Sequence, residues 1–336
     1  MDEKLHLYVM YAADDNYAPY LGVSLFSLFE NNRNINEITV YAVLDGVSDE
    51  NKDRLRKMSE EFNRDLRLID AEEVKNKMIQ LGLPKYRGSY ATHYRKFFKY
   101  VIDDNVERIL YIDSDSIVCG DLSMLLTLDM GESCVGVVLD SLSNKYKLLL
   151  GFEPNETYFN AGVTLINVAN WYKYNCDEIL IDHIQNKRSK YCNPDQDLFN
   201  IALKGKTMVL PPEYNFTPVH RAYSDKSYDK YYGFENYYTQ NQIENARMFP
   251  KILHTYRFIG EFPWHKGNVH PDNRIFDEYL FKSPWSDYIK EKAQTSYILK
   301  LEKIVYKILP RDLFLFFFSK LLYSSFKNKN KKLSEE

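Results

Sequence analysis

Apolar positions recur along the chain in two alternating patterns. Short continuous apolar runs predict buried strands, and longer segments with an apolar residue every three or four positions predict helices. The predicted strands are residues 5–13, 37–44, 66–69, 109–112, 135–139, 163–167 and 251–254. The predicted helices are residues 20–31, 49–62 and 90–102, with a further helix that begins at about Pro194. Strands that alternate with helices in this way predict an α/β fold with a mostly parallel sheet flanked by helices.

The pattern is lost in one long internal segment. Residues 214–238 are polar, irregular and rich in tyrosine, which predicts a long loop. Loops this long are usually functional, so we interpret this one as a candidate ligand-binding loop, because of its position and composition.

A different helical pattern begins near Ser296. Apolar residues recur at helical spacing from Ile298 to Ile308 with lysines on another face, and Pro310 separates them from a second apolar segment, residues 313–326. We therefore predict a catalytic domain over residues 1–265 and a C-terminal extension with basic amphipathic helices over 266–336.

Composition and charge narrow the class of protein. The 336 residues are 45% hydrophobic and 27% charged, as in ordinary globular proteins, and the net charge of −3 argues against general nucleic-acid binding. Residues 297–333 nevertheless hold nine basic and two acidic residues, a local charge of +7. Such a basic segment indicates a partner of its own, either a protein surface or an anionic membrane.

The lack of recognisable targeting patterns in the given sequence predicts a location in the cytoplasm. The N-terminus lacks a signal-peptide pattern, and the sequence has no apolar run of the roughly 18 residues that a membrane span needs. Four scattered cysteines fit a reducing compartment. Because a secretion signal is lacking, we interpret the glycosylation-like triplets at Asn155 and Asn215 as chance. We expect a cytoplasmic protein, peripheral on the inner face of the cytoplasmic membrane.

The chemistry is concentrated directly after the predicted strand 109–112, where Asp113 and Asp115 follow with one residue between them. In parallel sheets, ligands bind beyond the carboxyl ends of the strands. Two carboxylates this close repel each other, and a divalent ion such as Mg²⁺ or Mn²⁺ would let both ionise and would bridge them to phosphate oxygens. A solvated turn capped by Asp115 is the alternative.

Five motifs in order give the chain a resemblance to glycosyltransferase family 8, which contains bacterial lipooligosaccharide galactosyltransferases and glycogenin. They are residues 12–17, 109–115, 158–162 and 195–197, and His254 followed by Pro263-Trp264. The resemblance implies a GT-A-like fold and a retaining transfer of a hexose from UDP-galactose or UDP-glucose. It also implies Mn²⁺ (or Mg²⁺) as cofactor and, as acceptor, a bacterial surface glycan such as lipopolysaccharide or capsule.

The resemblance also implies roles for individual residues. The metal ligands would be Asp113, Asp115 and His254. The residues implied to hold the UDP-sugar are Ala12, Asp14, Asn16, Arg95, Asp113, Ser114, Asn160, Ala161, Gly260 and Lys266. The catalytic or acceptor-side residues would be Gln196, Asp195 and Asp140. Without the resemblance, Asp14–Asn16 and Asn160–Gly162 also fit plain turns, and His254 a structural histidine.

Gln196 bears on the mechanism. An amide is a poor nucleophile, so this residue argues against the double displacement that retaining glycosidases perform with a carboxylate. In the family's front-face mechanism, UDP leaves with metal assistance and the acceptor attacks from the same side. Gln196 would then stabilise the positive charge that develops on the sugar.

One departure from the family pattern stands out. The family commonly has a lysine before Pro-Trp that grips the diphosphate, and Phe262 occupies that position here. Arg257 or Lys266 is the candidate replacement. The missing lysine also keeps open a non-catalytic protein that binds nucleotide sugars or glycans. Self-glycosylation on a tyrosine, as in glycogenin, is a further alternative that the resemblance implies.

Overall fold

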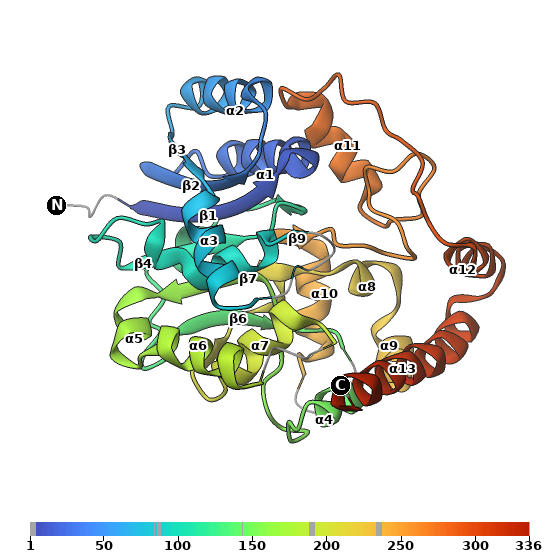
Figure 1. Cartoon of the computed structure of the whole chain (residues 1–336). Coiled ribbons are helices and arrows are strands. Elements are labelled where there is room, and N and C mark those ends of the chain that lie inside the picture. Colours follow the sequence, from blue (N-terminus) through green and yellow to red (C-terminus); the bar gives the residue numbers. More distant parts are fainter. Residues whose placement is uncertain are drawn as a thin grey trace.

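The computed structural model describes residues 5–83, 85, 89–142, 144–187, 192–232 and 237–335, which are built around a seven-stranded sheet (Figure 1). In spatial order its strands are β3 (Asp65–Asp70), β2 (Glu37–Asp45), β1 (His6–Asp14), β4 (Arg108–Ile112), β7 (Phe159–Asn167), β6 (Val135–Leu139) and β8 (Thr207–Val209). β7 runs antiparallel to β4 and β6, while the other neighbouring pairs are parallel. The carboxyl ends of β1, β4, β6 and β8 therefore lie along one edge, where the predicted site residues follow the strands. The predicted mostly parallel α/β sheet is confirmed.

Helices cover both faces of the sheet. Alternating residues of β1 show why: Val9 and Tyr11 enter the core on one face, and Met10 and Ala12 the core on the other. The first face is covered by α1 (Ala18–Asn31), α2 (Asp49–Glu61), α10 (Gln240–Met248) and α11 (Asn273–Lys282). The second is covered by α3 (Glu72–Gln80), η2 (Ala91–Tyr100), α5 (Val168–Lys173), α6 (Cys176–Lys187) and α7 (Pro194–Ala202).

A separate two-stranded sheet crosses the site edge. β5 (Ser116–Val118) follows the aspartate pair directly, and it runs antiparallel to β9 (Ile252–His254), with Ser116 opposite His254. This pairing brings the last predicted strand next to Asp115.

Two of the predicted elements differ in the structure. Residues 90–102, predicted as an α-helix, form the 3₁₀-type segment η2, which contains a non-helical residue at Phe97. Asn160–Gly162, for which a turn was an alternative, belong to strand β7. An irregularity in the pairing between β6 and β7 at Val137/Val138 accommodates these residues.

The prediction of a long loop over residues 214–238 is wrong for the described part. This segment continues η4 (Pro212–Asn215) into the short helices α8 (Pro218–Ala222) and α9 (Asp225–Tyr232), while residues 233–236 lie outside the described residues. Its tyrosines are not a solvated polar stretch, because Tyr223, Tyr228 and Tyr232 are buried together. The order comes from a partner far along the chain, which local patterning could not reveal.

That partner is the C-terminal segment, which forms α12 (Tyr297–Ile308) and α13 (Arg311–Glu335) (Figure 1). Tyr306, Phe314 and Leu315 pack against the tyrosines of residues 223–232, and α13 contacts α9 and α4 (Asn144–Leu149). The two predicted tail helices and the break at Pro310 are thus confirmed. Within the described part of the chain, none of the helices is both long and apolar enough to cross a membrane.

The division at residue 265 stays a prediction. Residues beyond it also enter the main core: Phe276 and Trp285 pack there, and the Trp285 ring occupies the space where a Cβ on Gly22 would lie. The remaining described elements are η1 (Asp15–Tyr17) and η3 (Ser123–Leu125).

Candidate functional site

The aspartate pair is held at the carboxyl end of β4 by its own strand and by β7. The N–H of Asp113 donates to the carbonyl of Gly162 at 2.7 Å, and the Tyr111 hydroxyl donates to Asp113 Oδ1 at 2.7 Å. The backbone carbonyl of Asp115 accepts from the N–H of Thr255 at 2.8 Å and from its hydroxyl at 2.7 Å. Both carboxylates therefore have fixed positions at the site edge.

His254 completes a three-residue cluster with the aspartates. Its Nε2 lies 3.3 Å from Asp115 Oδ1 and 3.7 Å from Asp113 Oδ2, and the ligand atoms of the three residues all lie within 4.8 Å of one another. The structure thus brings together the three residues predicted to bind a metal.

The other ring nitrogen of His254 shows which tautomer is present. Nδ1 lies 3.0 Å from Oδ1 of Asn160 and 3.1 Å from Oδ1 of Asn215. Asn160 Oδ1 is fixed as an acceptor because it also receives the N–H of Gly162 and the amide of Asn215. Nδ1 must therefore carry a hydrogen, and Nε2 is directed at the two carboxylates. An imidazole oriented through its second nitrogen is the usual arrangement of a metal-binding histidine.

A glycine makes this close packing possible. A Cβ on Gly162 would lie 2.0 Å from Cε1 of His254 and 2.9 Å from Oδ2 of Asp113. Any side chain at this position would displace the histidine or the carboxylate, so the glycine of the 158–162 motif has a steric role in the cluster.

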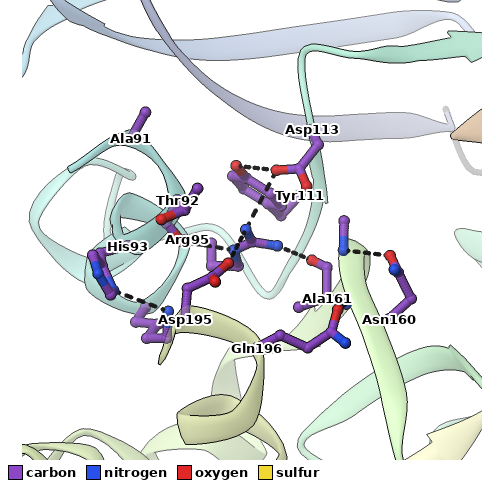
Figure 2. Close-up of polar contacts among 12 residues, drawn as sticks. Ala91, Thr92, His93, Arg95, Tyr111, Asp113, Asn160, Ala161, Asp195 and Gln196 are labelled. Carbon is purple, nitrogen blue, oxygen red and sulfur yellow. Dashed lines mark hydrogen bonds and ion pairs between the residues drawn. The ribbon is translucent and has the colours of Figure 1, made fainter. Parts of the chain in front are cut away.

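Arg95 links the aspartate pair to α7 (Figure 2). Its Nη2 lies 3.4 Å from both Asp113 Oδ1 and Asp195 Oδ2, and its Nη1 donates to the carbonyl of Ala161. The guanidinium stacks over the Tyr111 ring at 4.6 Å and is only 1% exposed as a residue. Arg95 is therefore a buried cation between two acidic residues and not a surface charge.

Asp140 and Gln196 form the neighbouring part of the site. Gln196 Nε2 donates to Asp140 Oδ2 at 3.1 Å and to the Tyr158 hydroxyl at 3.0 Å, while its Oε1 accepts from the N–H of Ala161 at 3.2 Å. Asp140 Oδ2 also accepts from the Asn160 amide at 3.0 Å. The same asparagine side chain thus connects the acid next to Gln196 with the imidazole of the metal cluster.

Burial and neighbouring charges shift the protonation of the cluster. Burial raises the pKa of Asp113, which Arg95 opposes and Asp115 reinforces. Burial alone would lower the pKa of His254, but the two carboxylates outweigh it and raise that pKa. Without a cation, protons therefore bind where a metal would, and metal binding has to displace them.

Two further buried groups are perturbed. Burial raises the pKa of Asp140. Burial also lowers the pKa of Lys96 to about 7, although the charge of Asp195 opposes the change. Lys96 is 2% exposed, and its Nζ lies 3.4 Å from Nδ1 of His93. A buried lysine next to the site costs stability at neutral pH.

The residues predicted to hold the nucleotide lie at the end of β1. Ser114 connects them to the cluster, because its hydroxyl donates to the carbonyl of Ala12 at 2.8 Å. Asp14 accepts from the N–H of Tyr17 at 3.1 Å and so begins η1, and Asn16 is exposed on it. Ala12 and Asp14 are thus one strand away from the aspartate pair, since β1 and β4 are neighbours.

The segment after His254 carries the departure from the family pattern. Phe262 stacks on Trp264 at 4.3 Å, Trp264 stacks on Tyr20 at 3.7 Å, and the Arg257 guanidinium lies over the Phe262 ring at 5.5 Å. The position of the expected lysine is therefore part of an aromatic stack that ends near η1, with a cation on its outer ring. Arg257 and Lys266 are both exposed.

Gly260, predicted to contact the UDP-sugar, also has a structural role. Its φ is +74°, and a Cβ there would lie 3.2 Å from the side chain of Leu299 in α12. Among the described contacts, those of Asp14, Asn16, Gly260 and Lys266 do not include another predicted site residue. The roles of all the predicted site residues toward a nucleotide sugar stay predictions.

Sequence reasoning missed several residues that hold the site together. Asn215, read as part of a chance triplet, is 1% exposed and orients His254. Asp197 accepts from the hydroxyls of Tyr146 and Tyr158, and burial raises its pKa to about 6. Tyr158 and Asp197 belong to the motifs at residues 158–162 and 195–197, so the sequence could have indicated them. Asn215 belongs to none of the five motifs, so the sequence did not indicate it.

The donor set fits a hard divalent cation. Two carboxylates and one imidazole are ligands that Mn²⁺ accepts, and Mg²⁺ prefers the oxygens. The geometry supports this fit. The lone pair of His254 Nε2 and the two carboxylates converge, which is unfavourable unless a proton or a metal ion lies between them. The α/β fold thus carries, at the edge where such sheets bind ligands, an acidic cluster that could hold a metal ion.

Comparison with known proteins identifies the family. Residues 8–267 match glycosyl transferase family 8, so the chain belongs to this family. It is 30% identical to the lipopolysaccharide 1,2-glucosyltransferase of Escherichia coli (strain K12), over 84% of this chain and 79% of that protein.

Solved structures confirm the fold. The galactosyltransferase LgtC, in complex with donor and acceptor sugar analogs, is 24% identical and has a TM-score of 0.66, over 83% of this chain and 96% of that one. The bifunctional glycosyltransferase WbbM in its apo form has a TM-score of 0.70 at 22% identity, and the alignment covers 85% of this chain. This chain spans about half (51%) of the length of WbbM. The predicted GT-A-like fold and family membership are thereby confirmed, and the chain is a glycosyltransferase of family 8.

Proposed function

We propose that this protein is a metal-dependent, retaining hexosyltransferase that moves galactose or glucose from a UDP-sugar to a bacterial surface glycan, such as lipopolysaccharide. The observation that carries the proposal is the convergence of Asp113, Asp115 and His254 Nε2 at one edge of the sheet. The names of the relatives support both hexoses, because one is a glucosyltransferase and another a galactosyltransferase.

Each part of the site has a task in this reaction. A divalent cation bound by Asp113, Asp115 and His254 would neutralise negative charge that develops on the departing diphosphate. Arg95 fixes the position of Asp113 and Asp195. The end of β1, with Ala12, Asp14 and Asn16, receives the nucleotide, and we assign the diphosphate contact of the missing lysine to Arg257 or Lys266.

Gln196 supports a front-face transfer. Its carbonyl oxygen accepts a hydrogen bond from Ala161, and its amide group is held by Asp140 and the hydroxyl of Tyr158. A carboxamide held in this way presents a dipole and not a nucleophile to the sugar. The acceptor hydroxyl would attack from the side that UDP leaves, with Asp140 and Asp195 on the acceptor side.

Transfer to a separate acceptor is favoured over self-glycosylation. Three tyrosines of the tyrosine-rich segment, Tyr223, Tyr228 and Tyr232, are each less than 10% exposed, within the cluster that holds the tail. They would have to leave this cluster to accept a sugar.

We further propose that α12 and the start of α13 bind an anionic membrane surface, where a lipid-linked acceptor is found. The face of α12 that points away from the body is apolar: Ile298 and Ile308 are 75% and 74% exposed, and Leu301 and Ile304 are also exposed. Exposed apolar residues next to lysines are typical of helices that lie in a membrane interface.

Release of UDP from UDP-glucose and UDP-galactose, with and without Mn²⁺, tests the reaction. We expect metal-dependent release that Asp113→Asn and Asp115→Asn reduce by at least about 100-fold, because each removes a charged ligand. Mn²⁺ binding is measured in parallel by calorimetry or electron paramagnetic resonance without substrate. Unchanged Mn²⁺ affinity in both variants would contradict the metal site, and UDP binding without turnover would favour a binding protein.

Vesicle co-sedimentation tests the membrane contact on the full-length chain. With phosphatidylcholine vesicles that contain phosphatidylglycerol, the double change Ile298→Glu and Ile308→Glu should weaken binding about tenfold or more. Phe281→Glu with Met124→Glu, at positions 79% and 68% exposed elsewhere on the surface, is the matched control. Equal loss in both pairs, or none in the first, would rule out the tail as the contact.

A further inference from the structure

A cavity opens on the same edge of the sheet as the predicted metal cluster, on the side away from β1. It has a volume of about 470 Å³, and its walls come from the ends of β6 and β8, the segment before β7 and the start of α10. The residues used below are Leu139, Thr157, Val209, Tyr237, Tyr238 and Gln242. Its volume lies within the range of roughly 300–1,000 Å³ that ligand pockets have.

Two of the residues that line the cavity are followed directly in the chain by residues that bind Gln196. Leu139 lines it, and the next residue, Asp140, accepts from Gln196. Thr157 lines it as well, and the hydroxyl of the next residue, Tyr158, accepts from Gln196 at 3.0 Å. Consecutive Cα atoms are about 3.8 Å apart, so the cavity adjoins the site.

The strand order gives this adjacency a direction. Along the edge, β1 carries the predicted nucleotide residues and β4 the metal ligands, and β6 and β8 lie beyond them. The cavity and the nucleotide therefore lie on opposite sides of Asp140 and Gln196. A molecule that occupies the cavity can extend toward Asp140 without crossing the donor.

The walls are rigid and aromatic. The Tyr238 hydroxyl accepts from the N–H of Leu139 at 3.0 Å and donates to the carbonyl of Leu210 at 2.6 Å, while the Tyr237 hydroxyl donates to the carbonyl of Leu139 at 3.4 Å. Both rings are thus fixed before any ligand binds. Aromatic faces with hydroxyl and amide groups around them suit a sugar ring, which has apolar C–H faces and a polar rim.

Charge argues against other ligands. Among the described lining residues, Glu156 is the one carboxylic acid and forms an ion pair with Lys204 at 2.7 Å, and none of these residues is Lys or Arg. A phosphate or a carboxylate would find no cation on this wall, whereas a neutral sugar needs none.

We infer that this cavity binds a sugar ring of the acceptor glycan, one or more units away from the ring that receives the hexose. The inference rests on the proposed function and deepens it, because it makes the enzyme select acceptors by length. Terminal monosaccharides would reach Asp140 without filling the cavity, and longer glycans would fill both.

Val209→Trp tests this inference by filling the cavity from β8, where Val209 is 42% exposed. The probes are lipopolysaccharide-core oligosaccharides of graded length with UDP-glucose or UDP-galactose as donor. We expect the KM for the longer acceptors to rise about tenfold or more with kcat within twofold, which is the signature of lost binding that does not change during the reaction. The KM for the shortest acceptor and UDP release without acceptor should stay unchanged.

Ile79→Trp, at a site 50% exposed on α3, is the matched control and should change none of these values. Gln242→Ala, at an exposed position of α10, is a milder second variant and should raise the KM for long acceptors about threefold. Equal KM values for long acceptors in wild type, Val209→Trp and Gln242→Ala would overturn the inference.

A binding measurement separates this inference from the proposed function. Saturation-transfer NMR with the same oligosaccharides needs no turnover. If the wild type releases no UDP, the proposed enzyme activity fails, and the cavity is still tested: weaker saturation transfer to the long oligosaccharides in Val209→Trp than in wild type and Ile79→Trp supports the inference, and equal transfer in all three proteins overturns it.

Discussion

The burial of side chains differs in opposite directions between two regions: the edge of the sheet around Asp113, and the C-terminal helices α12 and α13. At the edge, charged and polar groups such as Arg95 and Asn215 are almost fully buried and connected by hydrogen bonds. In the tail, large apolar groups such as Ile298 and Leu321 are 75% and 70% exposed. Both arrangements are costly for an isolated chain. The partners proposed above, a cation and a nucleotide at the edge and a membrane surface at the tail, would offset these costs.

The comparison also shows where each region takes its rigidity from. The edge combines residues from β4, β7, β9 and α7 through direct side-chain contacts. The tail is fixed on its inner face, where Tyr306, Phe314 and Leu315 pack into an apolar cluster and Lys303 pairs with Glu261. We therefore expect substitutions at the edge to have large effects and substitutions on the outer face of the tail to have small effects on the folded protein.

Gly162→Ala should give the largest effect. Its Cβ would collide with His254 and Asp113, so metal binding and transfer should fall by about 1000-fold, the several kcal/mol that a catalytic metal contributes. The measurements are Mn²⁺ affinity and UDP release. Gly136→Ala in β6 is the control, because its Cβ would meet only the apolar side chains of Leu210 and Leu165 at 3.2 and 3.4 Å. Similar losses in both variants would mean that the sheet, and not the cluster, is sensitive.

Lys96→Met should stabilise the protein at low and neutral pH. The pKa of Lys96 is lowered from 10.5 to about 7, so between these values the unfolded chain binds more protons and the wild type becomes more stable as pH rises. Below pH 7 the buried ammonium lowers the free energy of unfolding by its full amount. This amount is at most about 5 kcal/mol, since one pKa unit corresponds to about 1.36 kcal/mol. We expect the free energy of unfolding of Lys96→Met to exceed that of the wild type by about 2–4 kcal/mol at pH 6. This difference should shrink toward pH 10.

Urea unfolding at pH 6, 7.5 and 9 measures this difference. Lys282→Met, at a side chain 49% exposed, is the control and should give the same small change at each pH. A difference between Lys96→Met and wild type that does not depend on pH would show that Lys96 stays charged or is solvated.

Asn215→Ala should weaken metal binding about 10–100-fold, because it removes one of the two oxygens that orient the His254 imidazole. Asn200→Ala is a matched control: this asparagine is equally buried, but its amide bonds to the backbone of Phe159 and Gln196. Both variants should lose stability, and only Asn215→Ala should lose Mn²⁺ affinity in a calorimetric titration. Equal affinities would show that Asn160 alone orients the ring.

Lys303→Ala should give the smallest effect of the four. Lys303 Nζ lies 2.7 Å from Glu261 Oε1, whose side chain is 8% exposed, and it joins α12 to the segment after His254. Loss of the cation leaves a nearly buried carboxylate, so stability should fall by about 1–2 kcal/mol, less than for a fully buried pair. Lys282→Ala, in the exposed pair with Glu278, should cost less than about 0.5 kcal/mol in the same urea titration. Equal costs would mean that the tail is not anchored at this point.

Much of the site could be predicted from the sequence because its residues follow strands. The apolar run 109–112 placed Asp113 and Asp115 at the carboxyl end of β4, and the motifs placed Gln196 in the first turn of α7. Asn215 could not be predicted, since an isolated asparagine gives no sign in the sequence of whether it is buried or exposed. The order of residues 214–232 was missed for the same reason: its tyrosines are buried by a helix near the other end of the chain.

The sequence by itself determined six of the seven strands of the main sheet, all but β8, together with the position of the aspartate pair and the basic, amphipathic character of the tail. These features depend on the local period of apolar residues, which each segment carries without its neighbours. Only the tertiary structure decided that His254 lies beside Asp115 with Nε2 toward the carboxylates, that Arg95 is buried between two acids, and that the apolar face of α12 points outward. Each of these depends on which distant elements pack together, and the free energy of that packing is a property of the whole chain.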